Sequence, residues 1–396
     1  MLEEHVVIAR PRTLLTAVRP ETQRHLYEFY DQLRDADPCV WDRALNAWVV
    51  TSHELVSAAA GDPRLSSVRW SDPDGVEDDL RQVASVLSST MLYRDALEHT
   101  RLRKAAGRTF TARSVEALRA PITAAVDEII DRVLPSGTMD VVADLAVPLP
   151  FNAICALIHV PEADRAQMLS WSNDVAVAFG NARLTPDEKA AADRGMSGMV
   201  GYFDSLIDRP EALLQPGALS RDETIANTVL LLLAGHETTT HYLGNAVLAL
   251  LQHPDQAKLL ATSPSVMPTA VEELLRWDSP LQVILRRATT DLTFGGKDIA
   301  AGQTILLVTG AANRDPAAFP SPHTLDLARN GPARHVAFGH GPHFCLGSSL
   351  ARLEGEIVLG ALLTRLPALR LSQPGLAWRP SLNFRGLDQL TISWDV

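Results

Sequence analysis

One apolar segment, Thr224 to Gln252, constrains the fold of this chain more than any other feature. Its apolar residues lie nearly all round a helix, and such a helix runs through the interior of a protein. It ends before His253-Pro254, where a proline stops a helix. Its most apolar run, near Thr228–Gly235, is far shorter than the ~20 residues that span a bilayer. We therefore predict a long helix inside a protein core and no membrane partner.

The remaining sequence predicts a mostly helical chain with small sheets. Helical periodicity is clear over 115–133, with further helices predicted over 263–277 and 347–366. A short apolar run lies at Thr304–Thr309. The predicted hairpins pair 39–41 with 47–51, 292–294 with 297–299, and 382–384 with 389–394. No repeat or βαβ alternation is visible, so we expect a single domain, 1–396, mainly α with small β-sheets (α+β).

Composition excludes several classes of protein. Of the 396 residues, 46% are hydrophobic, which excludes a disordered chain. The net charge is −11 and no Lys/Arg-rich block is present, which argues against a nucleic-acid partner. Cys39, Cys155 and Cys345 are too few and too scattered for a disulfide framework, and residues 1–20 lack a signal-peptide core. We expect a cytoplasmic location.

The sharpest local feature is the run Phe338-Gly339-His340-Gly341-Pro342-His343-Phe344-Cys345-Leu346-Gly347. Its glycines permit a tight loop whose backbone approaches something flat or bulky. Cys345 immediately precedes a helix predicted from about Leu346, whose free N–H groups would favour a thiolate. A lone thiolate suits one axial position on a haem iron.

Two plainer interpretations compete with a haem ligand. A single cysteine in an apolar loop is most often just a buried core residue. The other is a zinc cluster formed by His335, His340, His343 and Cys345. These four residues lack the paired spacing that is typical of structural zinc.

A second polar motif, Ala234-Gly235-His236-Glu237-Thr238-Thr239, interrupts the long apolar helix. An acid and hydroxyls in mid-helix are costly unless they face a polar cavity. The hydroxyls and Gly235 weaken the helical hydrogen bonds, which predicts a local distortion and a groove beside the helix. Alternatively, the Thr238 hydroxyl bonds back to its own helix.

Charged residues at helical spacing form two further sets. Glu273 and Arg276, three residues apart, share a helix face and can pair. His99 and Arg103 lie one turn apart, and Arg286 precedes the second hairpin. Each of these cations, taken alone, is most often a solvated charge.

The run from Phe338 to Gly347 resembles the haem-binding loop of the cytochrome P-450 superfamily at every characteristic position. The resemblance implies the P-450 fold, with haem b (iron protoporphyrin IX) between the long central helix and the Cys-loop helix. It implies Cys345 as the metal ligand, and Glu237 and Thr238 as catalytic residues that relay protons to dioxygen. The implied cofactor-binding residues are His99, Arg103, Ala234, Gly235, Arg286, Phe338, Gly339, His343, Cys345 and Gly347.

Within that set, His99, Arg103, Arg286 and His343 would clamp the haem propionates. The pair Glu273–Arg276 resembles the family's Glu-x-x-Arg motif, with Arg329 as the third member of a structural network. Similarity continues through Ala312–Pro316 and Phe384–Leu387, so it extends from about His99 to the C-terminus.

The resemblance is to soluble bacterial members, and it implies a monomeric haem-thiolate monooxygenase. We expect the enzyme to hydroxylate or epoxidise a mid-sized small-molecule substrate with O₂. A ferredoxin and its reductase would supply the two electrons. A peptide, polyketide or aromatic specialised metabolite would fit. An acidic ferredoxin would need a basic docking face. The candidates for that face are Arg101, Lys104, Arg108, Arg113 and Arg352.

By the same resemblance, the substrate pocket would draw on five segments. They are 66–91, 170–183, 230–237, 281–285 and 382–384, with Trp70, Trp171, Asn173, Gln282 and Asn383 among their members. Two alternative functions stay open. One uses the same oxidant for C–C or C–N coupling or ring closure without oxygen insertion. The other is a haem sensor or carrier without turnover, against which the intact Glu237–Thr238 pair argues.

Overall fold

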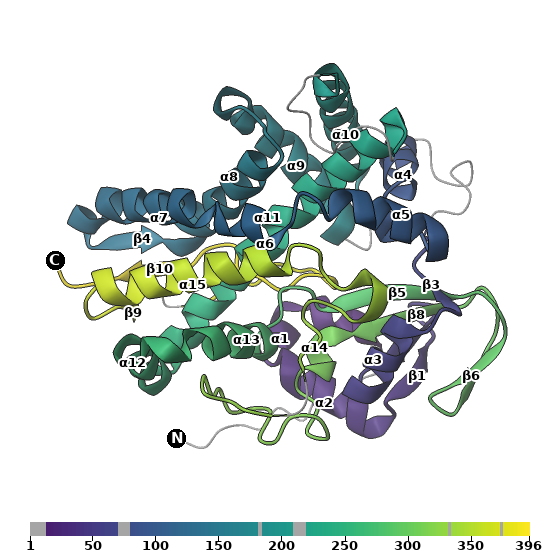
Figure 1. Cartoon of the computed structure of the whole chain (residues 1–396). Coiled ribbons are helices and arrows are strands. Elements are labelled where there is room, and N and C mark those ends of the chain that lie inside the picture. Colours follow the sequence, from purple (N-terminus) through teal and green to yellow (C-terminus); the bar gives the residue numbers. More distant parts are fainter. Residues whose placement is uncertain (1–12, 70–79, 181–183, 209–218, 332–333, 373–374) are drawn as a thin grey trace.

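The computed structural model describes residues 13–69, 80–180, 184–208, 219–331, 334–372 and 375–396. Helices dominate this part of the chain, and the strands lie in two groups at opposite ends of the molecule (Figure 1). The helices are α1 (Pro20–Gln23), α2 (Leu26–Ala36), α3 (His53–Gly61), α4 (Arg81–Ser88), α5 (Ala96–Ala106), α6 (Ala112–Glu116), α7 (Arg119–Val133), α8 (Pro148–Leu157), α9 (Arg165–Gly180), α10 (Pro186–Leu206), α11 (Arg221–Gln252), α12 (Pro254–Thr262), α13 (Met267–Trp277), α14 (Thr309–Ala312) and α15 (Ser348–Arg365).

The described strands form a larger sheet and two smaller ones. The larger sheet has the order β1-β2-β8-β5-β3, and the others are β4-β10-β9 and the hairpin β6-β7. The strands are β1 (Cys39–Asp42), β2 (Ala47–Val50), β3 (Leu65–Ser66), β4 (Thr138–Asp140), β5 (Val283–Ala288), β6 (Leu292–Phe294), β7 (Lys297–Ile299), β8 (Thr304–Val308), β9 (Arg370–Leu371) and β10 (Thr391–Ser393).

Strand β8 lies inside the larger sheet, parallel to β2 and antiparallel to β5. Its alternate residues enter different cores: Ile305 and Leu307 pack on the α3 side, while Leu306 and Val308 pack against α2. Successive side chains of a strand point to opposite faces, so a strand covered on both faces reads as a continuous apolar run. This is why residues 304–309 show no alternation.

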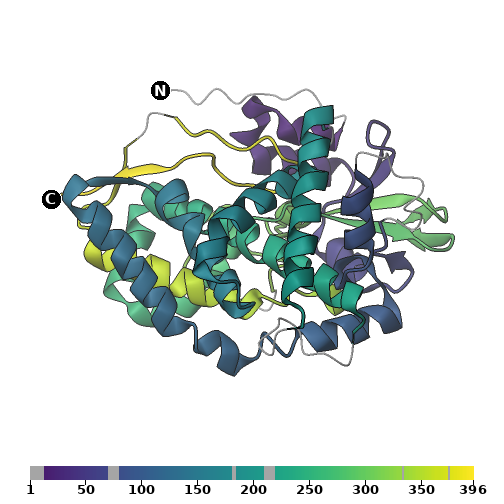
Figure 2. The same ribbon diagram turned by 90° about the horizontal axis from the view of Figure 1, so that it is seen from above.

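Helix α11 runs through the middle of the molecule and contacts α8, α9, α10, α13 and α15 (Figure 2). It begins with a capping box, in which Ser220 Oγ accepts from the Glu223 N–H and a Glu223 carboxylate oxygen accepts from the Ser220 N–H. Its apolar residues belong to the main core together with those of α7, α8 and α15. The predicted buried central helix is confirmed. The structure shows it as α-helix without a break over Arg221–Gln252, including residues 234–239, where the sequence predicts a distortion.

The first two predicted hairpins are confirmed as β1–β2 and β6–β7. The turn of the second contains Gly295 and Gly296, both with positive φ. The helix predicted over 115–133 is divided into α6 and α7, and Gly137 with φ 65° follows its end. The helix predicted over 263–277 begins only at Met267.

The third predicted hairpin is wrong. Strand β10 pairs with β4 and β9, whereas Phe384 forms a bridge with Leu281 and Leu387 forms one with Trp378. Gly386 does not serve as a hairpin turn: a Cβ there would lie 1.9 Å from His241 Nδ1, so its missing side chain allows close packing on α11. The sequence pattern cannot distinguish that use of glycine from a turn.

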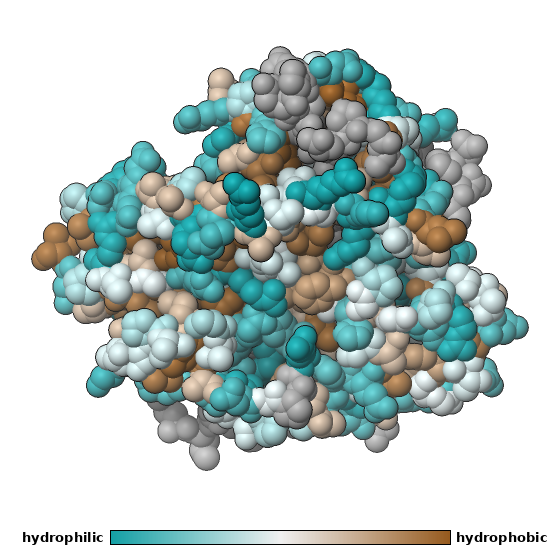
Figure 3. Space-filling view, viewed as in Figure 1, coloured by the Kyte–Doolittle hydropathy of each residue, from teal (hydrophilic) through white to brown (hydrophobic). Residues whose placement is uncertain are grey.

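Polar and apolar residues are interspersed over the face of the molecule in Figure 3, with the apolar ones in small areas. Among the helices of the described residues, none combines the length and hydropathy that crossing a membrane requires.

Candidate functional site

The loop that carries Cys345 is a tight turn held by its own backbone. The Cys345 N–H donates to Phe338 O at 2.8 Å, and the Phe344 N–H donates to Gly341 O at 3.0 Å. Gly339 and Gly341 have φ of 72° and 70°, the left-handed region that glycine adopts without strain. A Cβ on Gly341 would lie 3.0 Å from Gly61 Cα, so this glycine also lets the loop approach α3.

Cys345 lies three residues before α15, which begins at Ser348 and not at the predicted Leu346. Burial raises the pKa of the Cys345 thiol, while the Gly347 N–H and the charges of Arg103 and Arg352 oppose the rise. The backbone N–H thus favours the thiolate as predicted, but burial has the larger effect on the pKa of this thiol. A metal ion would displace the thiol proton, since the thiolate is the form that ligates.

Four basic side chains from three parts of the chain gather beside this loop. The His99 and His343 rings lie 4.1 Å apart, and Arg103 Nη2 donates to Phe344 O at 2.6 Å. Arg286 on β5 is 5% exposed and donates to its neighbouring carbonyl, Leu285 O. The structure thus brings together the four residues expected to clamp carboxylates.

The electrostatics of these four residues favour an anion between them. Burial lowers the pKa of Arg286 to about 10, and the charge of Asp95 opposes the shift. Burial lowers the pKa of His343 to about 3, and the charge of Arg286 is the next cause. Asp95 is already bound by Ser66 Oγ and the Ser67 N–H. Since no described acid forms an ion pair with Arg286, the cluster fits the carboxylates of a haem.

One stripe of α11 is open although the rest of the helix is buried. Between Thr224 and Leu250, every residue is buried except Ala234, Gly235, Glu237 and Thr238. These four positions lie within five consecutive residues, and their spacing places their side chains on the same side of the helix. Ala234 is exposed in a helix whose neighbouring residues are buried, and the small side chains of Ala234 and Gly235 leave room for a flat group beside them.

Two polar side chains lie in this open stripe. Burial raises the pKa of Glu237, and the charge of Arg379 opposes the rise. The Thr238 hydroxyl donates to Ala234 O at 3.2 Å, which is the back-bonded arrangement considered as the alternative. The hydroxyl oxygen can still accept a hydrogen bond in that arrangement.

Glu273 forms a buried network with the two arginines expected from the sequence. Arg276 donates to both Glu273 carboxylate oxygens, at 2.7 and 2.8 Å. Arg329 Nε lies 3.0 and 3.1 Å from the same two oxygens. Arg276 also donates to Asn313 O and Pro322 O, so the network joins α13 to the segment before the Cys loop.

The residues predicted for a docking face divide into two groups. Arg101 pairs with Glu223, and Arg352 pairs with Glu272 and stacks over the Phe338 ring. No ion pair within the described residues joins Lys104, Arg108 or Arg113 to an acid. The contacts of Arg352 with Glu272 were not predicted, because the two residues lie on helices that are far apart in the sequence.

Some of the predicted pocket residues are committed to packing. Gln282 is 1% exposed and presses on Gly310, where a Cβ would lie 1.9 Å from Gln282 Oε1. Trp171 packs on Gly198 of α10. Gln282 therefore supports the fold, contrary to the prediction, whereas the half-buried Trp171 stays a predicted pocket residue. Trp70 and residues 181–183 lie outside the described residues.

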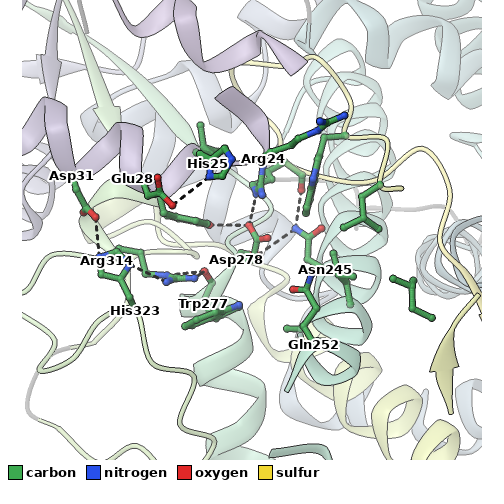
Figure 4. Close-up of a pocket in the computed structure, with 18 of the residues that line it drawn as sticks. Arg24, His25, Glu28, Asp31, Asn245, Gln252, Trp277, Asp278, Arg314 and His323 are labelled. Atoms are coloured by element: carbon green, nitrogen blue, oxygen red, sulfur yellow. Dashed lines mark hydrogen bonds and ion pairs between the residues drawn. The ribbon is translucent and has the colours of Figure 1, made fainter. Parts of the chain in front are cut away.

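A separate cavity of about 820 Å³ lies between α2, the C-terminal end of α11 and the C-terminal segment (Figure 4). Its buried carboxylate is paired: Asp278 accepts from Tyr27 Oη and Arg385 Nε, both at 2.8 Å. Asn245, which also lines the cavity, donates to Arg385 O at 2.9 Å, while its Oδ1 accepts no hydrogen bond from the described residues. Arg314 and Arg385 stack on Trp277 and Trp378, each at 3.6 Å. None of the candidate site residues lines it, so we assign it to the scaffold.

Comparison with known proteins covers nearly the whole chain. The family model described as Cytochrome P450 matches residues 265–373. The biotin biosynthesis cytochrome P450 of Bacillus subtilis is 36% identical over 95% of this chain and 98% of its own. The 6-deoxyerythronolide B hydroxylase of Saccharopolyspora erythraea is 37% identical over 93% of this chain and 96% of its own. The structure of P450BioI with an acyl carrier protein ligated to hexadec-9Z-enoic acid has a TM-score of 0.88, at 35% identity, covering 95% of this chain and all of that one.

The fold and these matches define a haem-thiolate monooxygenase of the type found in bacteria. The chain belongs to the cytochrome P450 family. Enzymes of this class take a small-molecule substrate, O₂ and electrons from a redox partner.

Proposed function

We propose that this P450 binds haem b through Cys345 and oxygenates a mid-sized specialised metabolite. The observation that carries the proposal is the group of basic side chains beside the Cys345 loop. The buried Arg286 forms no ion pair with an acid of the described residues, and propionates there could pair with Arg286 and Arg103 and accept from His99 and His343. The open stripe of α11 supports the same placement.

When bound, a haem with a thiolate ligand supplies an oxidant able to attack unactivated C–H bonds. The chain supplies the surroundings for that chemistry. Ala234 and Gly235 leave room against one face, because neither has a bulky side chain. Burial raises the pKa of the half-buried Glu237 carboxyl, so it holds a proton to higher pH than an exposed one does. The Thr238 hydroxyl would accept that proton and donate its own.

The proposed reaction is hydroxylation or epoxidation. Support comes from relatives named for such reactions, among them the 6-deoxyerythronolide B hydroxylase. Polyketides are therefore the first substrates to test, followed by peptides and aromatic compounds. Acyl chains on a carrier protein belong in the same panel, since P450BioI was solved with one.

The proposed electron donor is a ferredoxin with its reductase, and the proposed enzyme is a cytoplasmic monomer. An acidic ferredoxin would meet the exposed Lys104, Arg108 and Arg113, for which no ion pair is seen among the described residues. These cations lie at or after the end of α5, which also carries His99 and Arg103 of the haem-side cluster. The three cysteines are unpaired, as expected of a reducing compartment.

The test is turnover under ¹⁸O₂ with ferredoxin, its reductase and NADPH, after a screen for compounds that shift the haem spin state. We expect the product to gain one labelled oxygen atom. A product that has lost hydrogen without gaining oxygen would favour coupling or ring closure instead. NADPH consumption that no compound in the panel stimulates would contradict the proposed substrate class.

A further inference from the structure

His241 is a buried polar side chain of α11 that the proposed reaction does not use. It lies one helical turn after Glu237, and its side chain is 2% exposed. The distance from His241 Nε2 to Glu237 Oε1 is 3.8 Å. This is too long for a hydrogen bond, but a small rotation of the glutamate side chain would close it. Active-site hydrogen bonds are often long before the substrate binds.

The C-terminal segment fixes the imidazole in this position. Gly386 presses on the other ring nitrogen, since a Cβ there would lie 1.9 Å from His241 Nδ1. The Phe384 ring lies on the same segment, with its centroid 5.9 Å from that of His241. Nε2 is therefore the ring nitrogen that faces the glutamate.

The groups around His241 keep it uncharged. Burial, together with the charges of Arg379 and His236, lowers the pKa of His241 to about 3. Arg379 forms an ion pair with the exposed Asp388 at 3.3 Å. A neutral imidazole whose Nε2 faces a carboxylate carries its hydrogen on Nε2. In that tautomer the N–H donates to the carboxylate, whereas in the other tautomer the Nε2 lone pair would repel it.

His236, the other buried histidine nearby, is engaged elsewhere. Its Nδ1 lies 2.8 Å from Leu232 O and its Nε2 lies 3.4 Å from Ser172 Oγ. Its ring also packs edge-on against Phe151. His241 is thus the histidine that the geometry assigns to Glu237, and His236 is a matched control on the same helix.

We propose that His241 is a positioning residue that donates to the Glu237 carboxylate, holds it beside Thr238 and favours its ionised form. The inference rests on the proposed role of Glu237 in proton transfer. Without this donor, desolvation would act on Glu237 with only the charge of Arg379 opposing it. Glu237 would then keep its proton to higher pH.

The test is an infrared titration of the Glu237 carboxyl in the haem-loaded protein. Its C=O band is identified by its loss in Glu237→Gln. In His241→Leu we expect the midpoint to rise by about one pH unit, a tenfold change in proton affinity. In His241→Gln, whose amide can replace Nε2–H, it should stay within a few tenths of a unit. His236→Gln should not move it.

An unchanged or lower midpoint in His241→Leu would overturn the inference, as would equal shifts in the Leu and Gln variants. If the Leu variant does not fold, His241→Asn serves, because its shorter amide should raise the midpoint above that of the Gln variant. The pH dependence of product formed per NADPH should follow the infrared midpoint. If Glu237→Gln leaves that ratio unchanged, the proposed proton role of Glu237 fails, whereas the infrared result still decides the contact.

Discussion

Glu354 is a carboxyl group that the fold buries without a partner. It lies on α15 with no exposed surface, and neither carboxyl oxygen has a hydrogen bond among the described residues. Burial raises its pKa well above the ordinary value of 4.5. The folded protein therefore holds a proton on Glu354 that the unfolded chain releases at lower pH.

This difference predicts a pH-dependent stability. A raised folded-state pKa gives stability that is present below the unfolded value and is lost as the pH rises towards the folded value. Glu354→Gln should remove this loss. The variant should match the wild type at about pH 4, below the ordinary carboxyl pKa of 4.5, and should be the more stable of the two at about pH 8. Denaturant unfolding at both pH values measures this, and a gap that does not grow with pH would contradict it.

Thr238 gives the residue-scale prediction for catalysis. Thr238→Ala should keep haem and substrate binding but divert electrons to peroxide, lowering product per NADPH by about tenfold or more. The control is Thr240→Ala, because the Thr240 hydroxyl donates to Ala146 O at 2.8 Å within the core. That variant should be less stable but should form as much product per NADPH as the wild type. If Thr238→Ala also forms as much product per NADPH as the wild type, the relay is excluded.

At the scale of elements, the Cys345 loop depends on glycine for two separate reasons. Gly341 needs a left-handed backbone, which costs other residues about 1–2 kcal/mol. It also faces α3, where a Cβ would lie 3.0 Å from Gly61 Cα and 3.1 Å from Ala60 O. Gly296, in the β6–β7 turn, has a similar φ of 73° and no atom within 4 Å of such a Cβ. The two glycines therefore separate backbone strain from close packing.

We expect Gly341→Ala to lower the free energy of unfolding clearly more than Gly296→Ala does. The excess is the cost of moving the loop away from α3, and it should be accompanied by faster loss of haem. Urea unfolding and haem transfer to a scavenger protein measure the two effects. Equal losses in both variants would show that the loop does not depend on contact with α3.

The elements predicted best from sequence are those whose signals are local. Helix α11 is recognisable because its apolar surface is continuous, and β6–β7 because two glycines stand between short strands. The pairing of β10 with β4 was missed, since residues 391–393 and 138–140 are far apart in the chain. For the same reason the contact of Arg352 with Glu272 was missed. The spacing of Glu237 and His241 was visible in the sequence, but their burial and the role of Gly386 were not.

At the scale of the whole molecule, a net negative chain must present a local positive surface to an acidic ferredoxin. Reversing Lys104 and Arg108 together to glutamate should slow electron transfer by about tenfold at low ionic strength and flatten its salt dependence. The control is Lys258→Glu, on the distant α12. Stopped-flow reduction in the presence of carbon monoxide measures the rate. A double reversal that behaves like the control would place the docking site elsewhere.

The central claim is that Cys345 sulfur ligates a haem iron, and the spectrum of the reduced carbonyl complex tests it most directly. The purified wild type should show the strongly red-shifted Soret band that reports a thiolate ligand. Cys345→Ser should lose that band even where it retains haem. A chain that takes up no hemin, or a serine variant with the band intact, would contradict the account.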